Sequence, residues 1–594
     1  MAITCRRVGR PSAAARQEGD EVSDNLQEFA PSDPLATLPA PGSTRTGRLL
    51  RRVTGGPGTP IFDAAVWARR SALQSRRWLR RTQQGAIPAA PQAGEQLRSL
   101  SRVRTRAVID AQATPIDVHL RTAVWLRDLL DAHGIEYFAM PRNSLFLDLG
   151  IRAADAERFR DLIADEWDRR AIVYGPYTDR IYPAEAPRGG PAPGSFARER
   201  AVRLVLATGP QGVDWAWPLD AGVTVHFWVD MDGGVLGAPI RNRYATYLLQ
   251  STRASVAELD FHGETFRSLS DLVIPHVDDI DFPVDLVYTW VDGRDPVWRE
   301  RMLHKREVVL GKVTANAIAD ARFQDLQELR YSLRSVHAFA PWVNRVWIVT
   351  DGQTPSWFDP SDDRVTIIDH RDIWDDPDKL PVFNSHAIEA RLHHIPGLAE
   401  HYIYFNDDMM FARPVQATDF FAPGGLMKIF PSPHQVGLGG RTLHEGAAQT
   451  AAKNDREVLL AATGTVQTQR LKHASYPQRK SVALELEERF PEYYARTTGA
   501  TFRSATDISC ISLQSWYAFR TGRAASSSIS FRYIDLMTED DLREMEVLRK
   551  QRNAAIMCLN QSENSEVDPL MVQEKLHDFL DDYLPVPSPY EATP

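Results

Sequence analysis

Acidic side chains follow three short apolar runs in the second half of the chain. The runs cover 285–291, 343–350 and 401–406, and they end at Asp292, at Asp351 and at the pair Asp407 and Asp408. One such aspartate alone would suit a solvated turn. Adjacent carboxylates, however, repel each other and raise each other's pKa unless a cation lies between them. Mg²⁺ or Mn²⁺ on Asp407 and Asp408, completed by water and a substrate phosphate, is the chemistry that this pair would support.

The apolar runs predict the strands that position these acids. They are rich in Val, Ile, Tyr and Trp and are bounded by Gly, Asp and Pro, which is typical of strands covered on both faces. A further strand is predicted at 364–369. Open α/β sheets bind ligands at the carboxyl ends of their strands, so the acidic groups are expected to meet in one crevice. The sequence therefore predicts an α/β fold with a mostly parallel sheet.

A predicted helix at 322–339 carries two cationic side chains. Its apolar residues share one helical face, and Arg330 and Arg334 lie one turn apart. The two guanidinium groups either bind an anion together or lie solvated on an exposed face.

A second predicted helix begins after Asn384, whose side chain is suited to cap it. Glu389 and His393 are four residues apart on this helix and would face the same side. That spacing permits joint ligation, and an ordinary surface contact is the alternative.

Composition excludes several classes of protein. The chain has 594 residues, which is enough for more than one core, and its net charge of -9 gives no support for a nucleic-acid partner. Cys5, Cys510 and Cys558 lie far apart and are odd in number, which argues against a disulfide framework or a zinc site. No apolar run reaches the length of about 20 residues that crosses a bilayer. A cytoplasmic location is expected.

The composition also predicts the domain organisation. Residues 1–105 are rich in Arg, Pro and Ala, and we expect them to be disordered apart from an Arg-rich amphipathic helix at 61–81. An accessory α/β or α+β domain is predicted at 106–275, with a regulatory, acceptor-binding or packing role. The catalytic domain is expected at 280–530, and a helical segment with a frayed tail at 531–594.

Several ordered motifs resemble the Stealth family. They are Asp285–Gly293, Asp325 with Glu328–Ser335, Ala340–Val343 with Ile348–Gln353, and Asn384–Glu389 with His393, Ile395–Leu398 and Tyr404–Asp408. A looser fourth block contains His473, Pro477, Phe490, Pro491, Phe502, Arg503 and Asp507. The resemblance covers about 283–510.

The resemblance implies a Rossmann-like nucleotide-sugar transferase core and an activity in capsule or exopolysaccharide synthesis. The enzyme would move a sugar-1-phosphate from a nucleotide sugar, such as a UDP-hexose or UDP-N-acetylhexosamine, to a sugar hydroxyl. It further implies that His473 acts as base and that Arg503 neutralises phosphate charge, beside a metal on Asp407 and Asp408. The residues predicted to bind substrate are Asp292, Arg330, Arg334, Asp351, Asn384, Glu389, His393 and Asp507.

Two other functions suit the same residues. A metal-dependent glycosyltransferase would also use a strand-end acidic pair, but it would release a nucleoside diphosphate. A noncatalytic polysaccharide-binding protein would bind saccharide without consuming a donor. The Arg-rich segment 61–81 is expected either to attach the protein peripherally to the inner face of an anionic membrane, or to be a solvated helix that packs on a domain or docks on a partner.

Overall fold

The structure is a computed structural model, and it describes residues 91–100, 103–167, 169–176, 200–309, 325–441, 445–562 and 567–592. These residues belong to one compact unit. The segment 61–81, predicted as an amphipathic helix, lies outside the described ranges. Among the residues that are described, no helix is both long enough and apolar enough to cross a bilayer.

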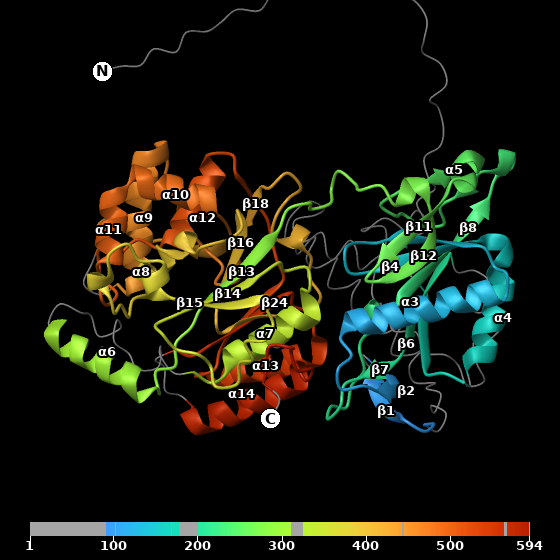
Figure 1. Ribbon diagram of the computed structural model, residues 1–594, viewed down its shortest axis with the longest axis horizontal. Helices are drawn as coiled ribbons and strands as arrows, with labels where there is room; N and C mark the ends of the chain where they lie inside the picture. The colour runs from blue at the N-terminus through green and yellow to red at the C-terminus, as the bar shows by residue number, and fades with distance from the viewer. Residues whose placement is uncertain are drawn as a thin grey trace, which may run out of the picture. The chain divides into compact units, whose positions relative to one another are not determined.

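A five-stranded sheet forms the centre of the C-terminal half (Figure 1). Its order is β15 (Val365–Asp369), β14 (Val346–Thr350), β13 (Val284–Thr289), β16 (His401–Asn406) and β21 (Tyr476–Arg479). The first four strands are parallel, and only β21 runs antiparallel to its neighbour. The predicted α/β fold with a mostly parallel sheet is confirmed.

Alternate residues of each central strand enter different cores. Leu286, Tyr288 and Ile348 belong to the cluster that also holds Leu329 and Leu333 of helix α7 (Glu328–Phe339). The intervening side chains pack on the opposite face of the sheet, and they include Val287, Trp347, Val349 and Tyr402. Because both faces are covered, the strands are apolar throughout, and this is why the sequence shows them as continuous runs.

The helix predicted after Asn384 is shorter than expected. Helix α8 covers only Ser385–Glu389, with the Asn384 side chain accepting from the His386 N–H as its cap. A separate 3-10 helix follows at Leu392–His394. Glu389 and His393 therefore do not share one helical face, and the basis for their joint ligation is absent.

The C-terminal segment 531–594 packs into the C-terminal half and contains strands as well as the predicted helices. Its strands β23 (Phe531–Asp535) and β24 (Ile556–Asn560) form a sheet with β17 (Met409–Phe411), which directly follows the acidic pair. Helices α13 (Glu539–Gln551) and α14 (Pro569–Tyr583) complete this segment. Tyr590 is fully buried, so the expected frayed tail is instead packed.

Further helices and short strands surround these sheets. In Figure 1, α9 to α12 gather on one side of the central sheet, and α7, α13 and α14 lie on another. Their bounds are α6 (Pro296–Val309), α9 (Ala447–Thr463), α10 (Lys480–Arg489), α11 (Pro491–Thr498) and α12 (Cys510–Arg520). The short strands are β18 (Met427–Ile429), β19 (Pro431–Gln435), β20 (Gln469–Leu471) and β22 (Ala524–Ser526).

The N-terminal half has its own mixed sheet and core. Strands β3 (Tyr137–Pro141), β4 (Leu147–Arg152), β6 (Ala201–Leu206) and β8 (Val223–Asp230) form its centre, flanked by α3 (Pro115–Ala132) and α4 (Ala156–Trp167). The outer strands are β5 (Ile172–Pro176), β9 (Leu236–Gly237) and β10 (Tyr247–Leu248), and a hairpin is formed by β11 (Val256–Phe261) and β12 (Glu264–Leu269). Strand β1 (Glu95–Leu100) pairs with β2 (Val103–Ile109), and β2 pairs with β7 (Thr208–Gly209). Both β1 and β2 begin before the boundary predicted at 105.

Candidate active site

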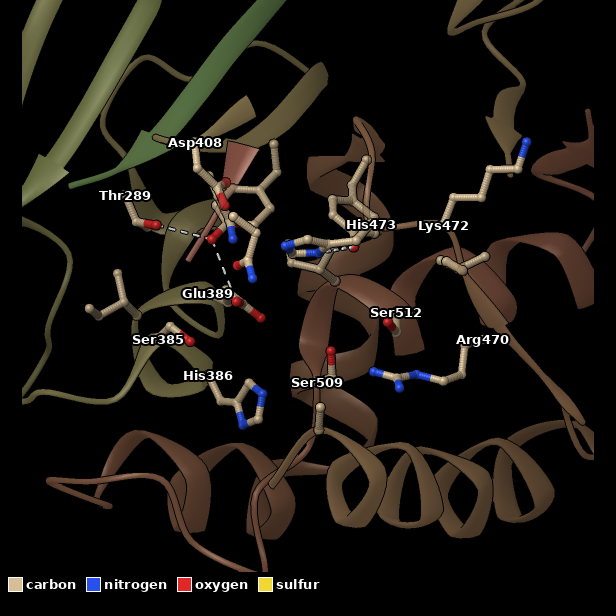
Figure 2. Close-up of a pocket in the computed structure, with 18 of the residues that line it drawn as sticks. Thr289, Ser385, His386, Glu389, Asp408, Arg470, Lys472, His473, Ser509 and Ser512 are labelled. Carbon is tan, nitrogen blue, oxygen red and sulfur yellow. Dashed lines mark hydrogen bonds between the residues drawn. The ribbon is translucent and has the colours of Figure 1, made fainter. Parts of the chain in front are cut away.

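A cavity of 1070 Å³ opens at the carboxyl ends of the parallel strands. The residues at or just after these ends line it, namely Thr289, Trp290 and Val291 of β13, Asp351 of β14, His370 of β15, and Asn406, Asp407 and Asp408 of β16. Figure 2 shows Asp408, Glu389 and His473 around its centre, with Arg470 and Lys472 on the far wall. The expected convergence of strand ends on one crevice is present for Asp351, Asp407 and Asp408.

The acidic pair has the electrostatics of a cation site. Burial raises the pKa of Asp407 well above its ordinary value, and the neighbouring charges of Asp408 and Asp325 raise it further. The buried Oδ1 of Asp408 has no hydrogen-bond partner among the described residues. Its Oδ2 accepts only a weak bond from the Cys558 thiol, at 3.4 Å. A bound cation would supply both the missing partner and the missing positive charge.

The groups around Asp408 determine which ion fits. Asp408, His473 and Cys558 each offer one ligand atom, and these atoms lie within 4.8 Å of one another. Mg²⁺ and Mn²⁺ prefer oxygen, so Asp407 and Asp408 suit them, whereas a thiolate favours softer ions. Burial raises the pKa of the Cys558 thiol well above its ordinary value, which disfavours the thiolate. The donor set therefore fits a hard cation on the carboxylates better than zinc on the sulfur.

His473 lines the cavity and brings a ring nitrogen within 4.8 Å of a carboxylate oxygen of Asp408. Its Nδ1 lies 3.0 Å from the hydroxyl of Tyr476, which fixes the orientation of the ring. Burial lowers the pKa of His473 below its ordinary value of 6.5, although the charge of Asp408 opposes the shift. The ring is therefore neutral near pH 7 and is able to accept a proton.

Arg503 is held in the cavity wall by a chain of hydrogen bonds. Its guanidinium donates to the Ser385 hydroxyl at 2.7 Å. Beside it, Asp507 Oδ2 accepts from the Ser504 N–H at 2.8 Å and from the Asn384 amide at 2.9 Å. Asp507 and Asn384 are fully buried and do not line the cavity. These two residues, predicted to bind substrate, are placed instead to position the loop that carries Arg503.

Glu389 lines the cavity, and its carboxylate is hydrogen-bonded to Tyr404, which in turn contacts Thr289. Tyr404 donates to its carboxylate at 3.5 Å, and the Tyr404 hydroxyl also lies 3.0 Å from that of Thr289 (Figure 2). Burial raises the pKa of Glu389, while the charges of His386 and Arg503 lower it. This carboxyl group is available to form a hydrogen bond with a ligand hydroxyl in the cavity.

Four other residues predicted to bind substrate are not in the cavity lining. Asp292 accepts from the Arg294 N–H at 2.9 Å within a turn. His393 lies 2.7 Å from Glu487, as does His394. Arg330 and Arg334 both pair with Glu591, at 2.6 and 2.8 Å. Sequence spacing identified charged pairs here, but their partners come from distant parts of the chain.

The two arginines instead hold the C-terminal tail. The side chains of Arg334 and Glu591 are only 8% and 4% exposed, so their pair is buried. Burial alone would raise the pKa of Glu591, but the hydrogen bonds and charge of Arg334 lower it to about 2. This carboxylate therefore contributes stability above its ordinary pKa of 4.5 that is lost as the pH falls toward 2.

Arg334→Ala is accordingly expected to lower the free energy of unfolding by about 3–5 kcal/mol, because it leaves a buried carboxylate without its main partner. Urea unfolding at pH 7 measures this loss. Arg543→Ala, which removes a pair whose side chains are 70% and 71% exposed, is the control and should cost less than about 1 kcal/mol. An Arg334 variant as stable as the control, but with weakened nucleotide-sugar binding, would restore the predicted role in substrate binding.

The site also includes residues that the sequence did not single out as functional, either in the cavity lining or, for Cys558, buried behind it. Cys558 comes beside Asp408 because β24 pairs with β17 in a register that sets Cys558 opposite Met409. His386, Arg470 and Asp455 line other parts of the wall. Pairing between strands 150 residues apart leaves no local signal, whereas His386 lies within a motif already noted and could have been included.

The structure is an α/β protein with a cavity where its parallel strands end, which is the place at which open α/β sheets bind ligands. Family models for the Stealth protein conserved regions 1, 2, 3 and 4 match residues 282–303, 322–429, 472–520 and 546–594. An exopolysaccharide phosphotransferase of Streptomyces coelicolor is 36% identical over 92% of this chain and 94% of its own length. Exopolysaccharide phosphotransferase CpsY of Mycobacterium tuberculosis is 33% identical over 82% of this chain and 90% of its own. The chain belongs to the Stealth family and is a phosphotransferase.

The matched regions correct one boundary of the predicted resemblance. The block containing His473 and Arg503 is region 3, and region 4 lies at 546–594. That range includes β24, Cys558 and Glu591, so most of the segment predicted as a helical segment and tail lies within a conserved region of the family.

Solved structures give only distant likenesses. A galactosyltransferase, LgtC, in complex with donor and acceptor sugar analogs has 9% identity over 52% of this chain and 97% of its own, with a TM-score of 0.27. Mouse xyloside xylosyltransferase 1 has 9% identity over 47% and 98%, with a TM-score of 0.24. Likenesses at these scores carry no argument about function.

Proposed function

We propose that this enzyme transfers a sugar-1-phosphate from a nucleotide sugar to a saccharide hydroxyl and forms a phosphodiester. The observation that carries the proposal is the meeting of Asp407, Asp408, His473 and Arg503 around one cavity. Phosphoryl transfer depends mainly on positioning and on neutralising negative charge, and these four side chains offer both.

The walls of the cavity suit a nucleotide at one end. Trp298 packs edge-on against Phe383 with ring centroids 5.1 Å apart, and both line the cavity. Aromatic faces stack on nucleobases. Nearby in the lining, His370 and Asp351 are almost fully buried polar groups that a base could contact. A UDP-hexose or UDP-N-acetylhexosamine is the donor that the family resemblance implies, and an aromatic and polar lining of this kind is compatible with its nucleotide.

The reaction assigns one task to each group. An acceptor hydroxyl oxygen attacks the phosphorus attached to the sugar, while His473 takes the hydroxyl proton. The bond from that phosphorus to the bridging oxygen breaks, and the nucleoside monophosphate leaves with the electron pair. Arg503 lies where its guanidinium can neutralise oxygens of the pyrophosphate.

Asp407 and Asp408 are the residues that would hold Mg²⁺ or Mn²⁺. Such a cation supplies charge neutralisation to the pyrophosphate when bound. Asp325 and Glu328 lie close enough to Asp407 to interact with it electrostatically, and Glu328 also lines the cavity. Burial raises the pKa of both.

The acceptor is proposed to be a growing exopolysaccharide, as the names of the two relatives suggest. Synthesis of such a polymer at the inner face of a membrane would suit a cytoplasmic enzyme attached peripherally by residues 61–81. Because that segment lies outside the described residues, the attachment stays a prediction from the sequence.

The nucleotide product separates this function from glycosyl transfer at the same site. With a panel of UDP-sugars and a saccharide acceptor, we expect UMP and no stoichiometric UDP. UDP as the main product would mean attack on the anomeric carbon. Binding without any nucleotide release, at several metal concentrations, would favour the noncatalytic alternative. Chromatography of the nucleotides measures all three outcomes.

A further inference from the structure

One wall of the cavity comes from a segment outside the family's conserved regions. Region 2 ends at residue 429 and region 3 begins at residue 472, so residues 430–471 are matched by neither. Helix α9 in this segment presents Ala448, Ala452 and Asp455 to the cavity, at positions that repeat along one helical face. The small alanine side chains leave room for a ligand beside this face.

Asp455 has a carboxylate oxygen that the protein does not use. Its side chain is 1% exposed, and Oδ1 accepts from the Ser509 N–H at 2.9 Å. Oδ2 has no hydrogen-bond partner among the described residues. Burial raises the pKa of Asp455 well above its ordinary value. Oδ2 is therefore available either as an acceptor, when ionised, or as a donor, when protonated.

Gln467 repeats this arrangement next to α9. Its side-chain amide donates to the Ala452 carbonyl at 3.0 Å, which sets it against the same helical face. Its Oε1 has no partner within the described part of the chain, and the residue is 6% exposed. An unpaired buried polar atom destabilises the folded protein, so two in one wall indicate a site that a ligand completes.

The chemistry of these two oxygens selects the class of ligand. A phosphate group is an acceptor and cannot donate to Gln467 Oε1, whereas a sugar hydroxyl both donates and accepts. Ser509 and Ser512 add hydroxyl groups to the same wall (Figure 2). Trp516 also lines the cavity and offers an apolar face of the kind on which a sugar ring packs.

We propose that Asp455 and Gln467 bind hydroxyl groups of a sugar ring and determine which sugar the enzyme accepts. This role rests on the proposed function, since the ring belongs either to the donor sugar or to the saccharide acceptor. Asp455 and Gln467 lie outside the matched regions, so relatives that share the reaction chemistry are free to differ at this wall and in their sugar.

The variants must separate recognition from structure, because Asp455 also accepts from the backbone of the loop after Arg503. Asp455→Asn keeps an oxygen for the Ser509 N–H and presents an NH₂ group in place of Oδ2. Asp455→Ala removes both atoms, and Gln467→Met removes the second oxygen independently. Glu457→Gln, on the same helix and 55% exposed, is the matched control.

Binding of UDP is compared with binding of UDP-glucose, UDP-galactose and UDP-N-acetylglucosamine by calorimetry, and acceptor KM is measured by nucleotide release. If the ring is the donor's, Asp455→Ala weakens binding of the preferred UDP-sugar about 10- to 100-fold while UDP binds as in wild type. If it is the acceptor's, acceptor KM rises by a similar factor and donor binding is unchanged. Gln467→Met should change the same quantity. Asp455→Asn distinguishes the two roles of Oδ2. Wild-type binding by this variant would mean that Oδ2 donates to the ligand. Binding as weak as that of the alanine variant would mean that Oδ2 accepts from it.

Two results would overturn the proposal. One is wild-type donor binding and acceptor KM in both Asp455→Ala and Gln467→Met. The other is an equal loss of UDP and UDP-sugar binding with a lowered melting temperature, which would mean that Asp455 only supports the loop. Failure of the proposed function looks different, because it appears in the wild-type protein as release of UDP or of no nucleotide. The calorimetric comparison keeps its meaning in that case.

Discussion

Asp408→Asn is expected to reduce turnover at least about 100-fold while leaving the fold intact. The amide keeps the volume of the carboxylate but loses the charge that would hold a cation. Asp408 Oδ1 has no hydrogen-bond partner among the described residues, and Cys558 gives Oδ2 only a long contact, so little protein structure depends on that charge. Asp407→Asn should have a similar effect. Nucleotide release at a series of Mg²⁺ and Mn²⁺ concentrations measures both variants.

The dependence on metal concentration is the decisive part of this test. A lost metal ligand raises the concentration of cation needed for half-maximal activity, whereas general damage does not. Asp540→Asn, at a side chain that is 89% exposed, is the control and should behave as wild type. If Asp407→Asn and Asp408→Asn both kept near-normal activity at limiting Mg²⁺, the acidic pair would not be the metal site.

The sequence predicted the central sheet well because burial on both faces imposes a strong local pattern. The strands ending at Asp351 and Asp408 are each continuous apolar runs, and parallel pairing then fixes which ends meet. For the same reason Asp351, Asp407 and Asp408 could be placed in one crevice from sequence alone. The order β15-β14-β13-β16-β21 and the antiparallel β21 were not predicted, because they depend on pairing between segments that are distant in sequence.

The charged pairs were less predictable because their partners are remote in sequence. The helical spacing of Arg330 and Arg334 shows that they act together, but only the folded tail shows that they act on Glu591. Glu389 and His393 are separated by the end of α8, and no Gly or Pro in the sequence marks this helix end. The proline of this stretch comes only at position 396. Asp455 carries no sequence signal at all, since an aspartate within a polar helix is typical of a solvated face.

His473→Ala is expected to reduce turnover by about 10²- to 10⁴-fold, the usual contribution of a general base. Because burial holds the pKa of His473 below 6.5, the wild-type ring is neutral at pH 7. Activity should therefore fall only when the pH drops below this lowered pKa and the ring takes up a proton. In the alanine variant this acid limb of the pH profile should disappear. Tyr476→Phe, which removes the hydroxyl 3.0 Å from Nδ1, should cause a smaller loss and keep the limb.

The nearness of His473 to Asp408 offers a rival role as a metal ligand. Activity of His473→Ala that returns at high Mg²⁺ would favour the ligand, whereas a loss that persists at saturating cation, with the acid limb gone, identifies the base.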